Sequence, residues 1–446
     1  IVTLGIVYGD IGTSPLYVLK AILAGGKEIN DLLVLGGISC IFWTLTLQTT
    51  LKYVIVTLRA DNHGEGGIFA LFALLKKKYP IIIILTMIGG STLLADGVIT
   101  PAITVTSAIE GLKINNPNVP VIPVVLIIIA VLFSIQRFGT NVIGKFFGPI
   151  MLIWFVMLGV LGISQIVTMP HVLLAINPMY AIKLLIEYPS GILLLGAVFL
   201  ATTGAEALYS DMGHCGIKNI RLTWIFVKTM LVLTYFGQGA WALSNPDIAG
   251  NVNPFYAIMP DWFLVPGIMI ATAAAIIASQ ALISGSFTLV SEAISLNIWP
   301  QFKVSYPSTI KGQVYIPLVN FFLWIACSFV VIFFESSSHM EAAYGLSITI
   351  TMIMTTLLLS QWLPSSGYKN IFRILFVCTY LGIEGIFLMA NLNKFMHGGW
   401  FTILLGLFFF TIMYGWYYGR KIKNRYISYT NLENYVNQFN DLKNYI

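Results

Sequence analysis

Long apolar runs, each followed by a short polar connection, repeat along almost the whole chain. Most runs have about 20 residues, the length that an α-helix needs to cross a hydrocarbon core of about 30 Å. The pattern therefore predicts an all-α polytopic membrane protein with twelve transmembrane helices. We expect these helices at 1–24, 32–58, 81–112, 119–136, 146–169, 190–212, 219–244, 264–296, 316–334, 341–362, 370–392 and 398–419.

The composition changes after the last apolar run. Residues 420–446 are polar, rich in Asn and Tyr, and unsuited to a bilayer. We therefore expect one transmembrane domain over 1–419, followed by the start of a C-terminal cytoplasmic segment over 420–446.

Lys and Arg in the connections predict the orientation, because cytoplasmic loops carry an excess of both. With the N-terminus inside, twelve such residues fall in cytoplasmic connections and four in outer ones. Both termini are then cytoplasmic, and a plasma-membrane location is expected. The cytoplasmic set is Arg59, Lys76, Lys77, Lys78, Arg137, Lys145, Lys218, Arg221, Lys303, Lys311, Lys369 and Arg373; the outer set is Lys27, Lys113, Lys183 and Lys394.

Composition argues against several classes of protein. The chain is 57% hydrophobic and 9% charged, whereas soluble domains carry about 25% charged residues. Its basic residues lie at segment ends, so no nucleic-acid surface is indicated. The four cysteines are far apart and show no metal-ligand spacing. No nucleophile–base pair is visible, so neither an enzyme nor a cofactor is expected.

The first apolar segment contains the most unusual feature of the chain. Gly9, Asp10, Gly12 and Pro15 interrupt it near its middle. A carboxylate at the bilayer centre costs about 2.5–3.5 kcal/mol on insertion scales. Backbone groups freed by an unwound turn add to that cost unless they line a cavity or bind something. These residues predict a broken helix around an ion site. The structural alternative is that Asp10 caps the half-helix that follows.

A second interruption lies in the sixth segment, at Thr202, Thr203, Gly204 and Glu206. Breaks in the first and sixth segments are typical of two five-helix repeats of opposite orientation, with a binding site where the breaks meet. Glu206 is a candidate proton carrier, because burial favours the neutral form of a carboxyl group. The alternative is a neutral carboxyl that only packs between helices.

The third segment places polar groups on one face. Asp96, Thr100, Thr104, Ser107 and Glu110 fall within a stripe of roughly 120°. Two carboxylates and three hydroxyls make a poor lipid-facing surface and a good wall for an ion pathway. The alternative is that the hydroxyls bond to their own helix or to neighbouring helices.

Several segments, taken in order, resemble the KUP/HAK/KT family of potassium uptake transporters. They read GIVYGDIGTSPLY, RADNHGEGGIFAL, ADGVITPAITVTSAIEGL, TTGAEALYSDMGH and GQVYIPLVNF. The resemblance implies the LeuT-like fold of the amino-acid–polyamine–cation superfamily, with a 5+5 inverted repeat plus two helices and broken helices 1 and 6. It also implies a homodimer and high-affinity, proton-coupled potassium uptake by alternating access.

The resemblance also assigns roles to residues of this sequence. It implies potassium ligands at Asp10, Tyr17, Asp96, Thr100, Thr104, Thr203 and Tyr344. It implies proton coupling at Asp10, Glu110 and Glu206. Some Gram-positive relatives are controlled by a cyclic dinucleotide, but no residue here locates such a site.

Two other kinds of transport protein stay open at this point. One is a potassium channel or uniporter, although no TVGYG-like filter loop is present. The other is an organic-cation or amino-acid permease of the same fold. Asp10 and Asp96 would repel a substrate carboxylate, which favours a cation.

Overall fold

The structure is a computed structural model that describes residues 2–26, 28–75, 81–114, 116–138, 144–307, 314–427 and 436. The predicted cytoplasmic residues Lys76, Lys77, Lys78 and Lys311 and the predicted outer residue Lys27 lie outside these ranges. So does most of the tail after 427.

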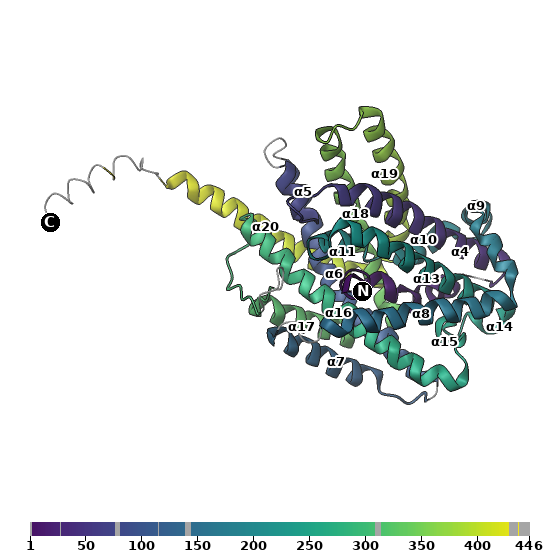
Figure 1. Ribbon diagram of the computed structural model, residues 1–446. Coiled ribbons are helices and arrows are strands. Elements are labelled where there is room, and N and C mark those ends of the chain that lie inside the picture. The colour runs from purple at the N-terminus through teal and green to yellow at the C-terminus, as the bar shows by residue number, and fades with distance from the viewer. Residues whose placement is uncertain are drawn as a thin grey trace.

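Every named element in the described residues is a helix, and eleven of these helices are long and apolar enough to cross a membrane (Figure 1). They match the eleven segments predicted from 32–58 onward. They are α4–η2–η3 (Asp31–Thr44, Leu45–Val56, Thr57–Arg59), α6–η4 (Ile82–Glu110, Gly111–Ile114), α7–η5 (Val121–Ile135, Gln136–Phe138), α8 (Gly144–Thr168), α10–η7–α11 (Gly191–Val198, Phe199–Thr202, Ala205–Ser210), α13 (Ile217–Ser244), α16 (Asp261–Ser295), α17 (Pro317–Phe334), α18 (Ser337–Ser365), α19 (Asn370–Leu392) and α20 (Gly399–Tyr426).

The first predicted segment is divided into four short helices. These are α1 (Val2–Val7), α2 (Gly9–Thr13), η1 (Ser14–Leu16) and α3 (Val18–Gly25). Pro15 lies in the first turn of η1, where its missing N–H leaves no hydrogen bond unmade. The interruption therefore falls where the sequence predicts it.

The second interruption follows from backbone conformation. Thr203 is extended, with φ −58° and ψ 145°, and Gly204 is left-handed, with φ +87°. Glycine adopts this left-handed region without a steric cost. The chain therefore leaves η7 at Thr203 and begins α11 at Ala205 in a new direction.

Several short helices in the described connections were not predicted. Residues Ile68–Leu75 form α5 within the connection that the sequence analysis left without a helix. This apolar run is too short to cross a bilayer, but it packs against α6 and α18. The remaining short helices are η6 (Pro170–Ile176), α9 (Pro178–Glu187), α12 (Met212–Cys215), α14 (Pro246–Ala249), α15 (Pro254–Ala257) and η8 (Phe395–His397).

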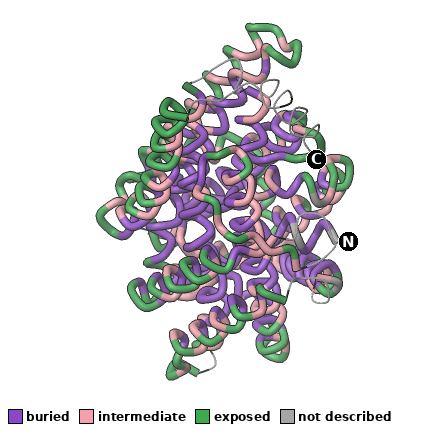
Figure 2. Tube along the Cα trace, turned by 90° about the vertical axis from the view of Figure 1, so that its left-hand side faces the viewer, coloured by how far each residue is buried: buried purple, intermediate pink, exposed green. Residues whose placement is uncertain are grey.

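Helix α6 lies at the centre of the bundle. It packs against α16, α17, α18 and α20, and nearly all of its residues are buried. Figure 2 shows buried residues concentrated in the interior and exposed ones at the periphery. Peripheral helices such as α7 and α19 instead expose apolar side chains, which suits contact with lipid.

Hydrogen bonds between residues at the helix ends show which connections lie at the same end of the bundle. Arg59 donates a hydrogen bond to Tyr368, and Arg420 contacts Asn297. The connections that hold these residues are all predicted to be cytoplasmic. Short helices α9, α14 and α15 gather at the opposite end in Figure 1, as the predicted alternation of sides requires.

Candidate functional site

The two broken segments meet inside the bundle. Ser14 donates a hydrogen bond from Oγ to the carbonyl of Leu200 at 3.1 Å, and its Oγ lies 3.3 Å from Oγ1 of Thr203. A Cβ added to Gly204 would lie 2.8 Å from the backbone nitrogen of Ile11. The absence of a side chain at Gly204 is what allows the two segments to approach so closely.

Side chains from other parts of the chain donate hydrogen bonds to the carbonyls of the first break. Trp154 donates to the carbonyl of Gly12 at 3.0 Å, and Gln238 to that of Pro15 at 3.2 Å. Asn253 donates to the carbonyl of Leu16 at 2.8 Å. These carbonyls already accept one hydrogen bond each, so the side-chain oxygens nearby are the main candidate ion ligands.

Asp10 lies at the crossing of the two breaks with only 4% of its surface exposed. Its Oδ1 accepts a hydrogen bond of 2.9 Å from the hydroxyl of Tyr344 on α18. Its Oδ2 is buried and has no hydrogen-bond partner among the described residues. A buried carboxylate oxygen without a donor is an acceptor that a cation can use.

Asp96 on α6 supplies a second carboxylate, also 4% exposed. Thr100 donates to its Oδ1 at 3.1 Å. Asp96 is close enough to Asp10 for the two charges to interact, and Tyr344 is within reach of Thr100. Thr104, one turn further along α6, is buried, and its hydroxyl has no hydrogen-bond partner in the described part of the chain.

Tyr17 and Thr203 border the same region. The hydroxyl of Tyr17 lies 3.5 Å from Ser14, and its ring meets that of Tyr344 edge-on at 6.4 Å. Thr203 donates to the carbonyl of Leu200 at 2.8 Å. The structure thus gathers six of the seven predicted potassium ligands from α2, the residue after η1, α6, the sixth-segment break and α18, with Thr104 adjacent along α6.

The candidate ligand atoms are all oxygens. Carboxylate, hydroxyl and phenol oxygens suit a hard cation rather than a transition metal. The described residues contain no cluster of His, Cys, Asp and Glu that would hold a transition metal or zinc. The arrangement can bind a monovalent cation and compensate its charge with two carboxylates.

A narrow cavity of about 40 Å³ reaches this site. Asp10 and Gly97 line one part of it, and Ser210 and Asp211 line another, near the end of α11. The loop glycines Gly66 and Gly67 approach Tyr209 and Ser210 closely. The cavity therefore extends from Asp10 toward the end of the bundle that is predicted to be cytoplasmic.

Glu110 lies elsewhere. It is fourteen residues after Asp96 on α6, or about 21 Å along the helix. Its carboxylate accepts hydrogen bonds of 2.9 and 2.5 Å from Ser337, and it lies 3.9 Å from Lys20. In the nearby connection after α19, burial lowers the pKa of Lys394, an effect that the carboxylate of Glu341 opposes.

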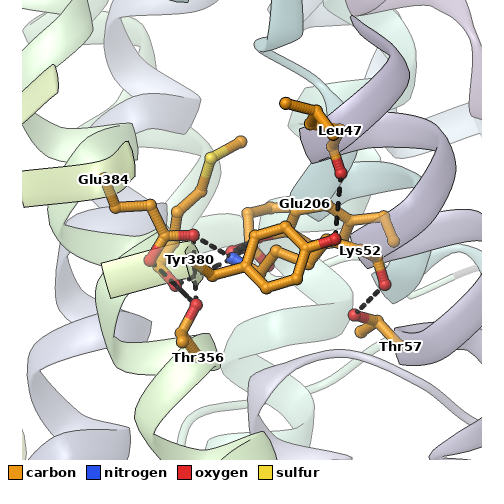
Figure 3. A network of polar contacts seen from close by, with 9 residues as sticks. Leu47, Lys52, Thr57, Glu206, Thr356, Tyr380 and Glu384 are labelled. Atoms are coloured by element: carbon orange, nitrogen blue, oxygen red, sulfur yellow. Dashed lines mark hydrogen bonds and ion pairs between the residues drawn. The ribbon is translucent and has the colours of Figure 1, made fainter. Parts of the chain in front are cut away.

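Glu206 belongs to a network that the sequence analysis missed (Figure 3). Its carboxylate accepts a short hydrogen bond from Tyr53. Lys52, next to Tyr53, pairs with Glu384 on α19 at 2.5 Å. The signal was present, because a charged residue within an apolar segment is itself a functional indicator, and both Lys52 and Glu384 fit that description.

Comparison with known proteins identifies the family of this chain. A family model described as the K+ potassium transporter integral membrane domain matches residues 1–421. The probable potassium transport system protein Kup of Cytophaga hutchinsonii is 58% identical over 441 residues, which cover 98% of this chain and 67% of that protein.

Two further relatives carry the same name. The one from Flavobacterium johnsoniae is 55% identical over 445 residues, covering 98% of this chain and 68% of that protein. The one from Streptococcus agalactiae serotype III is 51% identical over 457 residues, covering 99% and 68%. The family match and these relatives show that this chain belongs to the K+ potassium transporter family, whose members are integral membrane transporters and not enzymes.

Proposed function

We propose that this chain takes up potassium with high affinity by proton-coupled symport, through alternating access. The observation that carries the proposal is the unpartnered Oδ2 of Asp10, buried where two broken segments cross and within electrostatic range of Asp96. A potassium ion there would exchange hydration for oxygens of Asp10, Tyr17, Asp96, Thr100, Thr104, Thr203 and Tyr344.

The arrangement of helices supports a twelve-helix transporter with a LeuT-like core. The first segment is broken and apolar, and eleven further helices can cross a membrane. Breaks in segments one and six that contact each other fit two inverted five-helix repeats followed by two more helices. In this scheme residues 1–419 form the transport domain, and 420–446 begin a cytoplasmic segment.

Two carboxyl groups are the best placed for the transported proton. Asp10 lies in the ion site, and Glu206 lies on the half-helix that follows the second break. Glu110 is paired with Ser337 and Lys20 about 21 Å along α6 from Asp96, so we place it at the outer entrance. An inward-negative potential adds about 2.3 kcal/mol per charge per 100 mV to the drive for cation entry.

The relatives' names and the family resemblance extend the proposal. These relatives are named as probable potassium transport system proteins, which fits a site made of oxygen atoms. We also propose a plasma-membrane homodimer with cytoplasmic termini. We also propose control by a cyclic dinucleotide, for which no binding residue is assigned.

An amino-acid permease is the competing function within this fold. Such a protein must accept a substrate carboxylate at the breaks, where Asp10 and Asp96 would repel it. A channel or uniporter is the second alternative, and it differs in having no proton coupling.

Rubidium uptake into proteoliposomes tests these proposals. We expect saturable uptake that an inside-alkaline pH gradient stimulates, whereas large ohmic currents would indicate a channel. Asp10→Asn and Asp96→Asn should each reduce uptake at least about 100-fold, because each removes a carboxylate that compensates the ion's charge.

The control is Asp247→Asn, an exposed carboxylate at the outer end, which should transport like the wild type. Membrane content of each variant is measured in parallel. Normal uptake by both site variants would refute the site.

A further inference from the structure

The carboxyl group of Glu206 belongs to a buried cluster that spans four segments of the chain. Lys52 and Tyr53 come from η2, Glu206 from α11, Thr356 from α18 and Glu384 from α19. Figure 3 shows the side chains of Lys52, Glu206 and Glu384 converging between these helices. Lys52 and Glu384 are both 0% exposed.

All three protons of the Lys52 ammonium are used. Nζ donates to Glu384 at 2.5 Å, to the carbonyl of Met352 at 3.1 Å and to the hydroxyl of Tyr53 at 3.2 Å. Thr356 donates to the Glu384 carboxylate, 3.0 and 2.8 Å from its two oxygens. The lysine is therefore held as a fixed internal charge rather than as a side chain that can reach solvent.

Tyr53 connects this ion pair to Glu206. Its hydroxyl donates to Oε1 of Glu206 and accepts from Lys52. Two hydrogen bonds in series therefore connect the Lys52 ammonium to Glu206. The positive charge of Lys52 is already balanced by Glu384, so the charge of Glu206 is left without a counterion.

The charges of the cluster determine how many protons it holds. With both carboxyl groups ionised, two negative charges face one ammonium, and a net negative charge is buried, which is costly. With one proton added, the cluster is neutral. Lys52 is already paired with Glu384, so the proton belongs on Glu206.

Other titratable groups face Glu206. Asp96 on α6 is within electrostatic range, and so is Tyr209 on the same half-helix. Glu384 on α19 interacts with it directly through charge. Asp96 and Glu384 add only negative charge when ionised, so Lys52 is the cation that balances the cluster.

We propose that Lys52 and Glu384 are positioning residues for the proton, and that the triad Lys52–Glu206–Glu384 holds a single exchangeable proton on Glu206. This inference rests on the proposed symport. It also makes α19, which lies outside the proposed ten-helix core, part of the coupling machinery.

The two single substitutions have opposite consequences. In Glu384→Gln, Glu206 is the one carboxylate left to balance the Lys52 ammonium. Ionised Glu206 and Lys52 then form a neutral pair, so Glu206 loses its proton at a lower pH. Lys52→Met leaves two buried carboxyl groups without a cation, so protons are retained to higher pH. If these residues only packed between helices, the two substitutions would not shift the pH dependence in opposite directions.

The experiment measures rubidium uptake into proteoliposomes against pH, with proton entry followed by a dye inside the vesicles. We expect the pH midpoint of transport to move about one unit or more toward acid in Glu384→Gln and toward alkali in Lys52→Met. The double variant Lys52→Met/Glu384→Gln should lie between them. The matched control is Lys228→Met on α13, whose ammonium donates to Thr46 outside the triad; it should show no shift.

Shifts in the same direction, or no shift in variants that still transport, overturn the triad. If Lys52→Met does not fold, Glu384→Gln is compared with the double variant, whose pH midpoint should lie on the alkaline side of that of Glu384→Gln. The pH dependence of the unfolding midpoint, measured without rubidium on the same variants, separates the two proposals. Wild-type uptake without proton entry refutes the symport, while opposite shifts in unfolding would still support the triad.

Discussion

Asp10 is bonded on one oxygen and free on the other. Oδ1 accepts from Tyr344, whereas Oδ2 has no hydrogen-bond donor within the described ranges. A structural cap would use the carboxylate on the N–H groups of the half-helix that follows, but no side-chain cap of α2 or η1 is present. At the scale of the residue, the geometry therefore favours the ion site over the capping alternative.

Tyr344→Phe should weaken rubidium binding. The substitution removes a phenol oxygen that holds Asp10, and a hydrogen bond to a charged group is worth about 1.5–3 kcal/mol. We expect KM for rubidium to rise about 10-fold or more, with the maximal rate less affected, as measured by uptake at a range of concentrations.

Tyr188→Phe is the control for that measurement. It removes the same hydroxyl at the outer end, where Tyr188 donates to the carbonyl of Glu28, and it should leave KM unchanged. An unchanged KM in Tyr344→Phe would remove this tyrosine from the site.

At the scale of the element, the second break depends on one glycine. Gly204 is left-handed, and a Cβ there would also lie 3.0 Å from Cβ of Asp10. A non-glycine residue would meet both backbone strain and a close contact with the first break.

Gly204→Ala should lower stability by more than the roughly 1 kcal/mol of backbone strain alone, and should reduce transport. Gly367→Ala is the control, because Gly367 has φ +85°, close to the +87° of Gly204, but nothing within 4 Å of an added Cβ. Unfolding midpoints in detergent separate the two effects. Equal losses in the two variants would show that the contact with Asp10 has no energetic weight.

The second segment shows another effect at this scale. Residues Leu45–Val56 form a π-helix, and Thr50 and Thr57 donate to carbonyls five residues earlier. This winding sets the directions of Lys52 and Tyr53 within η2. π-helical turns are frequent at functional sites, in agreement with the proposed role of both side chains.

At the scale of the whole molecule, the cavity beside Asp10 favours access from one side. Ser286 on α16 lines it together with Ser210 and Asp211. The opposite end carries the Glu110–Ser337 hydrogen bonds and the charged pair with Lys20.

We expect Ser286→Cys, in a variant without the four native cysteines, to react with a membrane-impermeant thiol reagent from the cytoplasmic side. Potassium should slow the reaction, because the cavity leads to the ion site. The control is Ser279→Cys on the same helix, which is fully buried and not among the cavity-lining residues and should not react. Reaction of Ser286→Cys from the outer side alone would contradict this access route.

Local patterns predicted most of the fold. Apolar length located the membrane segments, because the bilayer requires about 20 apolar residues in any helix that crosses it. The breaks were also predictable, since Pro15 and Gly204 act through their own backbone. Helix α5 was missed because an eight-residue apolar run carries no signal of its own.

Sequence alone was enough to predict where helices cross the membrane, where they break and that Asp10 and Asp96 are candidate cation ligands, because length, backbone chemistry and the cost of a buried charge are local properties. The partners of these residues emerged only from the way the helices pack. Tyr344 bonds Asp10 across 334 residues, and Lys52 pairs with Glu384 across 332. Such pairings depend on which helix faces pack together, and no local pattern records that.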